Sequence, residues 1–183
     1  MKIMPERAYE ILAPRPLVLI TTMDSHGGIN AAPVSFTSPI SFDPSVIMVS
    51  LRPIRKTYQN IIDHKEFVMN ILGKEHATRV LGCATRYPDG INKLEQVGLR
   101  WYSAEKVGVP RVKEAKAWIE CKLLEEKKVG DHMVIFGQVV SAEIRDEYTE
   151  AGEINFAKLN VLLHASKDTF VTDYNIVKYK RYE

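Results

Sequence analysis

The sequence predicts a mostly antiparallel β-barrel with helices at its periphery. Its apolar segments are short, rich in β-branched residues and bounded by Pro, Gly, Asp or Ser, which is typical of strands. Helical patterns occur in few places and do not alternate regularly with the strands, so a doubly wound parallel sheet is disfavoured. The length of 183 residues suits one domain, and we expect a single domain over residues 1–183.

Six segments are predicted to be strands. The second follows a Gly-rich turn at residues 24–28, and the last follows a turn at residues 128–132. In chain order the predicted strands are residues 17–22, 29–38, 46–51, 67–72, 118–124 and 133–140. Short further strands are expected within residues 144–148 and 170–182.

Three segments place apolar residues at helical spacing. Residues 5–12 begin with Pro5, which suits the first turn of a helix. Residues 57–65 begin with Thr57, whose hydroxyl is the predicted N-cap. Residues 76–83 are the third predicted helix. These helices are too few to cover both faces of a parallel sheet, which again favours a barrel.

Composition excludes several classes of protein. The 25 Lys and Arg residues nearly balance the 23 Asp and Glu residues, which argues against a protein that binds nucleic acid through a strongly basic surface. No apolar run approaches the roughly 18 residues of a membrane-spanning helix. The first sixteen residues lack the continuous apolar core of a signal peptide, so we expect a cytoplasmic protein with no membrane partner.

Cysteine, histidine and motif patterns narrow the chemistry further. Cys83 and Cys121 lie far apart in the sequence, so we expect two buried free thiols, with a single disulfide as the alternative. The five histidines show no metal-ligand spacing, and we expect no metal site. The GxGxxG, GxxxxGK[ST], GxSxG and HExxH motifs are absent from the sequence.

A cluster of cations precedes the predicted helix at residues 57–65. Arg52, Arg55 and Lys56 lie where a helix N-terminus normally attracts acidic residues. An anion bound there would remove this conflict, because free backbone N–H groups, the Thr57 hydroxyl and the cations would converge on it. The cluster therefore predicts a ligand that carries a phosphate. The alternative is that these cations are solvated and that Thr57 is only a cap.

A second cluster covers residues 28–38, which carry no charge and many small or hydroxyl side chains. Small side chains let a flat ligand approach the backbone, and Asn30, Ser35 and Thr37 offer hydrogen bonds to its polar edge. The alternative is an ordinary half-buried strand with Pro33 at the edge of a sheet.

Two further residues are candidates for a functional role. His132 ends a tight turn, where an imidazole can donate to an anionic ligand edge or transfer a proton. Lys93 lies in a polar loop after the third predicted helix. The alternatives are a plain turn residue for His132 and a solvated surface charge for Lys93.

Several short motifs occur together in one order over roughly residues 14–140. They are Pro14-Arg-Pro16, Asn30-Ala-Ala-Pro-Val-Ser35, Asp43-Pro44, Lys56-Thr57, Asn92-Lys93 and Gly130-Asp131-His132. Each motif is weak alone, but the ordered set resembles the flavin reductase-like (flavoredoxin-type) family of FMN-binding split barrels. The resemblance implies a six-stranded antiparallel Greek-key split barrel with peripheral helices. It also implies a homodimer that holds FMN near the subunit interface.

The resemblance also implies the residues that hold FMN. Those expected to line the isoalloxazine ring and ribityl chain are Asn30, Ala31, Ala32, Ser35, Phe36 and Thr37. Those expected to hold the ribityl and phosphate groups are Ser50, Leu51, Arg52, Lys56 and Thr57. Lys93 and His132 correspond to the family's ring-proximal cations, which would stabilise negative charge on the reduced ring.

The implied function is an oxidoreductase that takes hydride from NAD(P)H or another two-electron donor onto FMN and passes electrons to an acceptor. No residue has the pattern of a nucleophile, and His132 is the candidate catalytic residue. One alternative is an FMN-binding electron carrier that does not react with NAD(P)H. Another is a barrel that binds a different phosphorylated ligand, or none.

Overall fold

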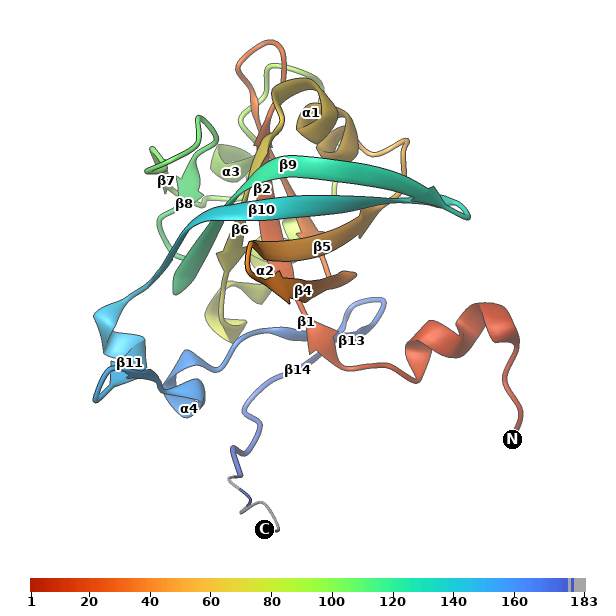
Figure 1. The fold of residues 1–183 in the computed structure, drawn as a ribbon, viewed down its shortest axis with the longest axis vertical. Helices are drawn as coiled ribbons and strands as arrows, with labels where there is room; N and C mark the ends of the chain where they lie inside the picture. The colour runs from red at the N-terminus through yellow and green to blue at the C-terminus, as the bar shows by residue number, and fades with distance from the viewer. Residues whose placement is uncertain (178, 180–183) are drawn as a thin grey trace.

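The protein is described by a computed structural model that covers residues 1–177 and 179. It is built round an antiparallel sheet with the strand order β3-β2-β6-β9-β10-β5-β4 (Figure 1). The bounds of these strands are β2 Val18–Met23, β3 Ile29–Val34, β4 Thr37–Phe42, β5 Ser45–Leu51, β6 Glu66–Ile71, β9 Ala117–Val129 and β10 His132–Ile144. The mainly β, antiparallel architecture predicted from the sequence is confirmed.

Short strands and helices surround this sheet. The short strands are β1 Arg15–Pro16, β7 Trp101–Tyr102, β8 Arg111–Val112, β11 Thr149–Glu150, β12 Glu153–Ile154, β13 Leu163–Ser166 and β14 Thr169–Val171. The α-helices are α1 Lys56–His64, α2 Ala77–Gly82, α3 Lys93–Gln96 and α4 Phe156–Leu159. The 3-10 helices are η1 Pro5–Glu10, η2 Lys74–His76 and η3 Asp146–Tyr148. No helix in the described residues is long and apolar enough to cross a membrane.

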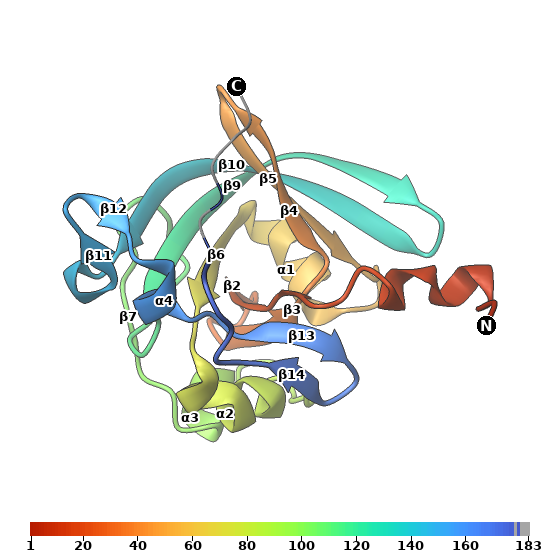
Figure 2. The same cartoon turned by 90° about the horizontal axis from the view of Figure 1, so that it is seen from below.

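The segment predicted as one strand over residues 29–38 is divided in two. β3 pairs with β2 and β4 pairs with β5, so the chain changes neighbours at Ser35 and Phe36. This division turns the six expected strands into the seven of the main sheet. It also joins the two edges of the sheet by two residues, which span roughly 10 Å at most. The sheet must therefore curl round on itself, as Figure 2 shows.

Each edge strand of the main sheet carries a proline within its bounds. Pro33 lies in β3 opposite Leu19, and Pro39 lies in β4 opposite Ile47. The register of the β4–β5 pair also shifts just after Pro39. Proline is confined to edge strands in sheets because it has no N–H to donate to a neighbouring strand.

The core lies on both faces of β2, which explains the continuous apolar run in this strand. Val18 and Ile20 pack with Val49 and Phe67 inside the barrel. Leu19 faces the opposite way and packs in a second cluster, which includes Val80 of α2 and Leu94 of α3. The alternating directions of neighbouring side chains thus supply two cores from one strand.

The hairpin formed by β9 and β10 is longer than the apolar runs in its sequence predict. Its register shifts twice, and such bulges bend a long hairpin. At Gly137 an added Cβ would lie 2.5 Å from the ring of Phe67, so the strand needs glycine there. The outer half of β9 is exposed from Leu124 to Val129, and its charged sequence gave no apolar signal.

Three expectations for the peripheral segments need correction. The predicted helix at residues 5–12 is the exposed 3-10 helix η1, which has no buried residue and projects away from the barrel (Figure 1). Residues 144–148 form the end of β10 and η3, since Arg145 leaves the sheet. Of residues 170–182, the described part contains the end of β14, and residues 178 and 180–182 lie outside the described residues.

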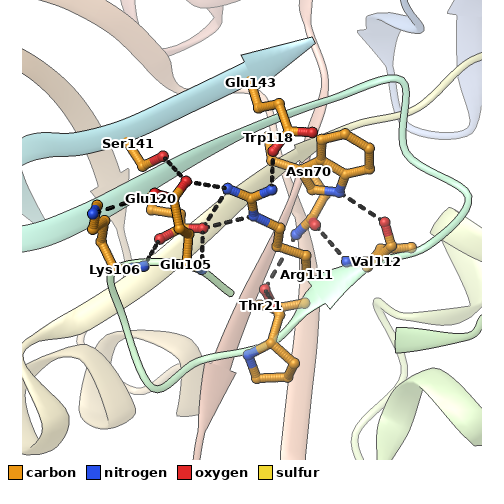
Figure 3. Close-up of polar contacts among 11 residues, drawn as sticks. Thr21, Asn70, Glu105, Lys106, Arg111, Val112, Trp118, Glu120, Ser141 and Glu143 are labelled. Atoms are coloured by element: carbon orange, nitrogen blue, oxygen red, sulfur yellow. Dashed lines mark hydrogen bonds and ion pairs between the residues drawn. The ribbon is translucent and has the colours of Figure 1, made fainter. Parts of the chain in front are cut away.

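A cluster of charged side chains surrounds the buried pair of Arg111 and Glu120 (Figure 3). The Arg111 Nε donates to Glu120 Oε1 over 2.6 Å, and another Arg111 nitrogen donates to Glu143. Glu120 also accepts from the backbone N–H groups of Glu105 (2.8 Å) and Lys106 (2.6 Å). Burial would raise the pKa of Glu120, but these hydrogen bonds and the Arg111 charge hold it below its usual value.

Both cysteines are buried and free, as expected. Burial raises the pKa of each thiol to about 12, so neither is a thiolate near neutral pH. Among the described residues, no group of three or more His, Cys, Asp and Glu side chains could hold a metal ion.

Candidate functional site

A cavity of about 500 Å³ lies where the two edges of the sheet meet the start of α1. Its walls come from β3 and the Ser35–Phe36 crossing, from the end of β5, from the segment that leads into α1, and from the segment after α2. The lining residues are Asn30, Ala32, Pro33, Val34, Ser35, Phe36, Ser50, Leu51, Arg52, Ile54, Arg55, Lys56, Thr57, Gln59, Cys83, Ala84, Thr85, Arg86, Tyr87, Asp89, Lys93 and His132.

The N-terminus of α1 opens into this cavity without a side-chain cap. The N-cap residue is Arg55, its side chain makes no capping hydrogen bond, and the first turn contains no acidic residue. The predicted cap, Thr57, is instead the second residue of the helix and is 3% exposed. Free N–H groups and the positive end of the helix dipole therefore face the cavity together with Arg55 and Lys56.

Thr57 and Asn30 are tied together at the cavity wall. Asn30 Nδ2 donates to the hydroxyls of Thr57 (3.0 Å) and Thr22 (3.1 Å), and Asn60 Nδ2 donates to the same Thr22 oxygen over 3.0 Å. The Thr57 hydroxyl accepts this hydrogen bond from Asn30 through its oxygen, so its own hydrogen can be donated to a bound molecule. Asn30 is 2% exposed, and its Oδ1 has no hydrogen-bond partner among the described residues. A donor on a bound molecule would satisfy this oxygen.

Lys93 is buried at the first position of α3, although the sequence alone suggested a solvated surface charge as its alternative. Its Nζ donates to the Cys83 carbonyl over 3.1 Å and lies 5.9 Å from the ring centre of Tyr87. Within the described residues, no carboxylate forms an ion pair with it. Burial lowers the pKa of Lys93, and the positive charges of Lys56 and Arg55 lower it further.

Lys56 is held by two carboxylates. Its Nζ lies 2.7 Å from Asp24 Oδ2 and 2.7 Å from Asp89 Oδ1. Burial would lower the pKa of Lys56, but its hydrogen bonds with the two carboxylates raise it. Burial likewise would raise the pKa of Asp24, but the Lys56 ammonium and the backbone N–H groups of Gly90, Gly28 and His26 hold it well below its usual range.

Aromatic and imidazole groups form the opposite end of the cavity. The rings of Phe36 and His132 lie with their centres 5.9 Å apart at a 32° angle. His132 Nδ1 donates to Asp131 over 2.7 Å, which fixes the orientation of the ring. The Arg15 guanidinium also lies over the Phe36 ring, 5.4 Å from the ring centre, which helps to hold this ring in place.

The Ser35 hydroxyl is tied to the C-terminal part of the chain. His164 Nε2 lies 2.9 Å from the Lys167 carbonyl, which can only accept, so Nε2 donates. In the neutral ring Nδ1 then accepts from Ser35, 3.1 Å away. Because β1 also pairs with β13, this end of the cavity is supported by both ends of the described chain.

Most of the residues predicted for the site lie together in this cavity. They are Asn30, Ala32, Ser35, Phe36, Ser50, Leu51, Arg52, Lys56, Thr57, Lys93 and His132. Within the described chain, the lining leaves out two predicted residues, Ala31 and Thr37. Ala31 points into the core between its two lining neighbours. The Thr37 hydroxyl donates to the Met48 carbonyl over 2.8 Å.

Sequence reasoning missed the contribution of residues 84–90, called here the 84–90 loop. Thr85, Arg86, Tyr87 and Asp89 from this loop line the cavity. It also missed Asp24, which accepts the Gly90 N–H over 3.0 Å and so fastens the loop. The loop has no periodic pattern, and only its Pro88-Asp-Gly90 turn signal marks it in the sequence.

Comparison with known proteins places the chain in a family. A family model described as a flavin reductase like domain matches residues 12–169. The chain is 33% identical over 165 residues to an uncharacterized protein of Pyrococcus abyssi, which covers 90% of this chain and 93% of that protein. The chain belongs to the flavin reductase-like family. Another relative of this flavin reductase-like protein is an NADH:riboflavin 5'-phosphate oxidoreductase of Streptomyces pristinaespiralis, 24% identical over 72% of each chain.

Solved structures confirm the fold of this flavin reductase-like protein. A Shewanella frigidimarina protein described as a flavin reductase with a split barrel domain has a TM-score of 0.86 at 19% identity, over 98% of this chain and 94% of that one. Flavoredoxin of Desulfovibrio vulgaris has a TM-score of 0.84 at 21% identity over 91% of both chains. An FMN-binding protein from Thermus thermophilus has a TM-score of 0.80 at 20% identity over 97% of both chains.

Proposed function

We propose that the protein binds FMN in the cavity and works as an FMN-dependent oxidoreductase. The observation that carries this proposal is the uncapped N-terminus of α1, which faces a cavity beside a buried lysine that has no carboxylate partner in the described residues. The cavity lining has more cations than carboxylates, and a phosphate would supply the missing negative charge. Similarity to an FMN-binding protein and to a riboflavin 5'-phosphate oxidoreductase supports the choice of FMN as that anion.

At the phosphate end, the residues present fit the group. The free N–H groups of the first turn of α1, the Thr57 hydroxyl and the Arg55 guanidinium would hold the phosphate. Arg86 lines the same cavity and adds a second guanidinium. Guanidinium groups bind phosphate oxygens in a bidentate manner, which orients the phosphate as well as attracting it.

At the ring end, the residues fit a flat molecule with a polar edge. Asn30 Oδ1 lacks a donor, and a ring N–H would supply one. Ala32 leaves room for close approach to the β3 backbone, and Phe36 and His132 provide flat surfaces. Lys93 and His132 would place positive charge or N–H groups beside the ring, where they would stabilise negative charge.

Bound FMN supplies a ring that accepts hydride from NAD(P)H or another two-electron donor and passes electrons to an acceptor. The protein's own part is to bind and orient that ring and to set the charge beside it. His132 is the candidate for holding a proton near the ring, because Asp131 fixes the orientation of its imidazole.

We also propose that the protein works as a homodimer. Large apolar side chains are exposed on β4 and on the outer half of the β9–β10 hairpin, among them Ile40, Phe42, Leu124 and Val129. Phe42 is 97% exposed. Exposed large apolar groups of this kind are typical of protein–protein contacts, and a second copy of the chain would bury them. Equilibrium sedimentation of the wild type and of Phe42→Ser tests this, with a dimer expected only for the wild type.

An anaerobic absorbance titration of the FMN-loaded protein tests the proposed reaction. We expect NADH or NADPH to bleach the oxidised-flavin band rapidly. A yellow protein that resists both nucleotides but is bleached by dithionite would favour the electron-carrier alternative, which similarity to flavoredoxin supports. A folded protein that cannot be loaded with FMN or riboflavin would contradict the proposal.

A further inference from the structure

Lys56 has two carboxylate partners that are built very differently. Asp24 and Asp89 each lie 2.7 Å from the Lys56 Nζ. The side chain of Asp24 is 4% exposed, whereas that of Asp89 is 63% exposed. One carboxylate of this pair is therefore part of the fold, and the other stands in the cavity in contact with solvent.

Asp24 cannot be exchanged for another anion. Besides Lys56 it accepts backbone N–H groups from His26 (2.9 Å), Gly28 (2.8 Å) and Gly90 (3.0 Å). An added Cβ at Gly28 would lie 2.7 Å from Asp24 Oδ2 and 2.8 Å from Gly90 Cα, so the two loops touch closely. Loss of the Asp24 carboxylate would leave four donors without their acceptor.

Asp89 has a single polar contact among the described residues, its ion pair with Lys56. It lines the same cavity as Arg52, Arg55, Arg86 and Lys93, and it is the one carboxylate of that lining within the described chain. An exposed carboxylate on one ammonium group is weakly held, because water solvates it nearly as well. A dianionic phosphate that enters the cavity meets the same ammonium group with a higher charge.

A second feature, at the ring end of the same cavity, indicates independently that the cavity takes a ligand. Asn30 is almost completely buried, and its Oδ1 is unpartnered in the cavity wall. The Thr57 hydroxyl to which Asn30 donates belongs to the first turn of α1. The residue next to it, Lys56, carries the ion pair with Asp89.

We propose that Asp89 is an exchangeable counter-ion of Lys56 that a flavin phosphate must displace. Asp89 thereby limits how strongly the protein prefers phosphorylated flavin (FMN) over riboflavin. This inference rests on the proposed function and adds to it a residue that governs specificity. Asp89 lowers the affinity for FMN because its negative charge repels the phosphate and occupies Lys56. It leaves the affinity for riboflavin unchanged, because riboflavin has no phosphate to compete with it.

The test compares the dissociation constants of FMN and riboflavin, measured by quenching of flavin fluorescence, in the wild type and in Asp89→Asn. We expect the variant to bind FMN about threefold to tenfold more tightly, the range for one partly exposed charge a few ångströms from a phosphate. Riboflavin affinity should change less than about twofold. Asp146→Asn, which removes an equal charge at η3, is the matched control and should change neither constant.

A double-mutant cycle with Lys56→Met makes the test sharper. The gain in FMN affinity from Asp89→Asn should be smaller in the Lys56→Met background, because the part that comes from freeing the ammonium group is lost and only the relief of repulsion remains. Inorganic phosphate, used as a competitor of FMN, should become more effective in Asp89→Asn in parallel with FMN. Thermal unfolding of each variant checks that the fold is intact.

Unchanged or weaker FMN binding by Asp89→Asn would overturn the proposal. An equal loss for FMN and riboflavin would show instead that Asp89 only fastens the 84–90 loop. If the wild type binds FMN normally and the variant behaves like it, this inference fails alone. If the folded wild type binds neither flavin, the proposed function fails with it.

Discussion

Arg111 and Lys93 are both buried cations, but their surroundings are opposite. Arg111 meets the carboxylates of Glu120 and Glu143, and burial, which would lower its pKa, is outweighed by these acceptors, so the pKa is raised (Figure 3). Lys93 meets a carbonyl and two neighbouring cations, Lys56 and Arg55, and its pKa is lowered. In the Arg111 cluster the positive charge is paired with carboxylates of the same chain, whereas the cavity around Lys93 has a surplus of positive charge.

This difference separates what holds the fold from what binds a ligand. The Arg111 cluster links the segment at residues 105–112 to β9 and β10, and its two central side chains are buried with their partners. The cavity leaves Lys93 without a carboxylate partner in the described residues and Asn30 Oδ1 without a donor. Unmatched buried groups are costly to folding, and a bound molecule that carries an anion and a hydrogen-bond donor would match both of them.

The largest effect is expected from a substitution in the Arg111 cluster, where the charges are matched. Arg111→Met would leave Glu120 buried with no cation, and we expect the free energy of unfolding to fall by about 3 kcal/mol. Urea unfolding followed by circular dichroism measures this loss. The folded fraction should still bind FMN as the wild type does, because Arg111 is not among the residues that line the cavity. A loss below about 1 kcal/mol would contradict the role given to this cluster.

The next effect is the response of the matched region to acid. The pKa of Glu120 is lowered in the folded state, so its stabilisation is fully present above its unfolded value and is lost as the pH falls through the folded value. We expect stability to fall below about pH 4.5, with this group contributing up to about 1.4 kcal/mol per pH unit. Glu120→Gln should flatten that part of the stability profile, and an unchanged slope would count against this assignment.

A smaller effect concerns the unmatched region. Lys93→Met removes the buried cation, and we expect FMN binding to weaken about tenfold near pH 7, the loss of one charge-assisted contact. A bound anion raises the lowered pKa of Lys93, so wild-type affinity should decline as the pH rises toward the ordinary lysine value of 10.5, and the variant should show a flatter profile. Fluorescence titrations across this pH range measure both effects. Parallel profiles would show that another group titrates.

The smallest effect is expected from removal of one hydroxyl of the cavity, that of Thr57. Thr57→Val removes the hydroxyl at the start of α1 without changing the size of the side chain much, and FMN affinity should fall about threefold to tenfold. Riboflavin affinity should fall less, because it lacks the phosphate. Thr37→Val is the matched control, since that hydroxyl is spent on the Met48 carbonyl. Equal losses for both flavins in Thr57→Val would refute a phosphate contact.

The strands could be predicted from the sequence because their apolar runs face one or two cores. The start of α1 and the cation cluster before it were also visible, because a charge pattern that opposes a helix dipole is a local signal. The division at Ser35 and Phe36 was not visible, since strand propensity continues unbroken through these residues. Which strand pairs with which is decided by contacts distant in sequence.

The site was predictable to the extent that it depends on residues close in the sequence. Asn30, Thr57 and His132 lie on separate elements. Before the structure, only the resemblance to a known family predicted that they belong to one site. The pairing of Lys56 with Asp24 and Asp89 crosses three segments, so no spacing rule reveals it. The exposed half of β9 was missed for another reason, because a solvated ribbon needs no apolar pattern.

The prolines of the two edge strands have a consequence for how copies of this protein can meet. Pro33 and Pro39 deprive β3 and β4 of an N–H group at the positions where a foreign strand would align. Growth of the sheet from one molecule into the next is therefore blocked at both ends, which protects a β-rich chain against fibril formation during heating or storage. The homodimer proposed above would then form through side chains on the faces of the sheet.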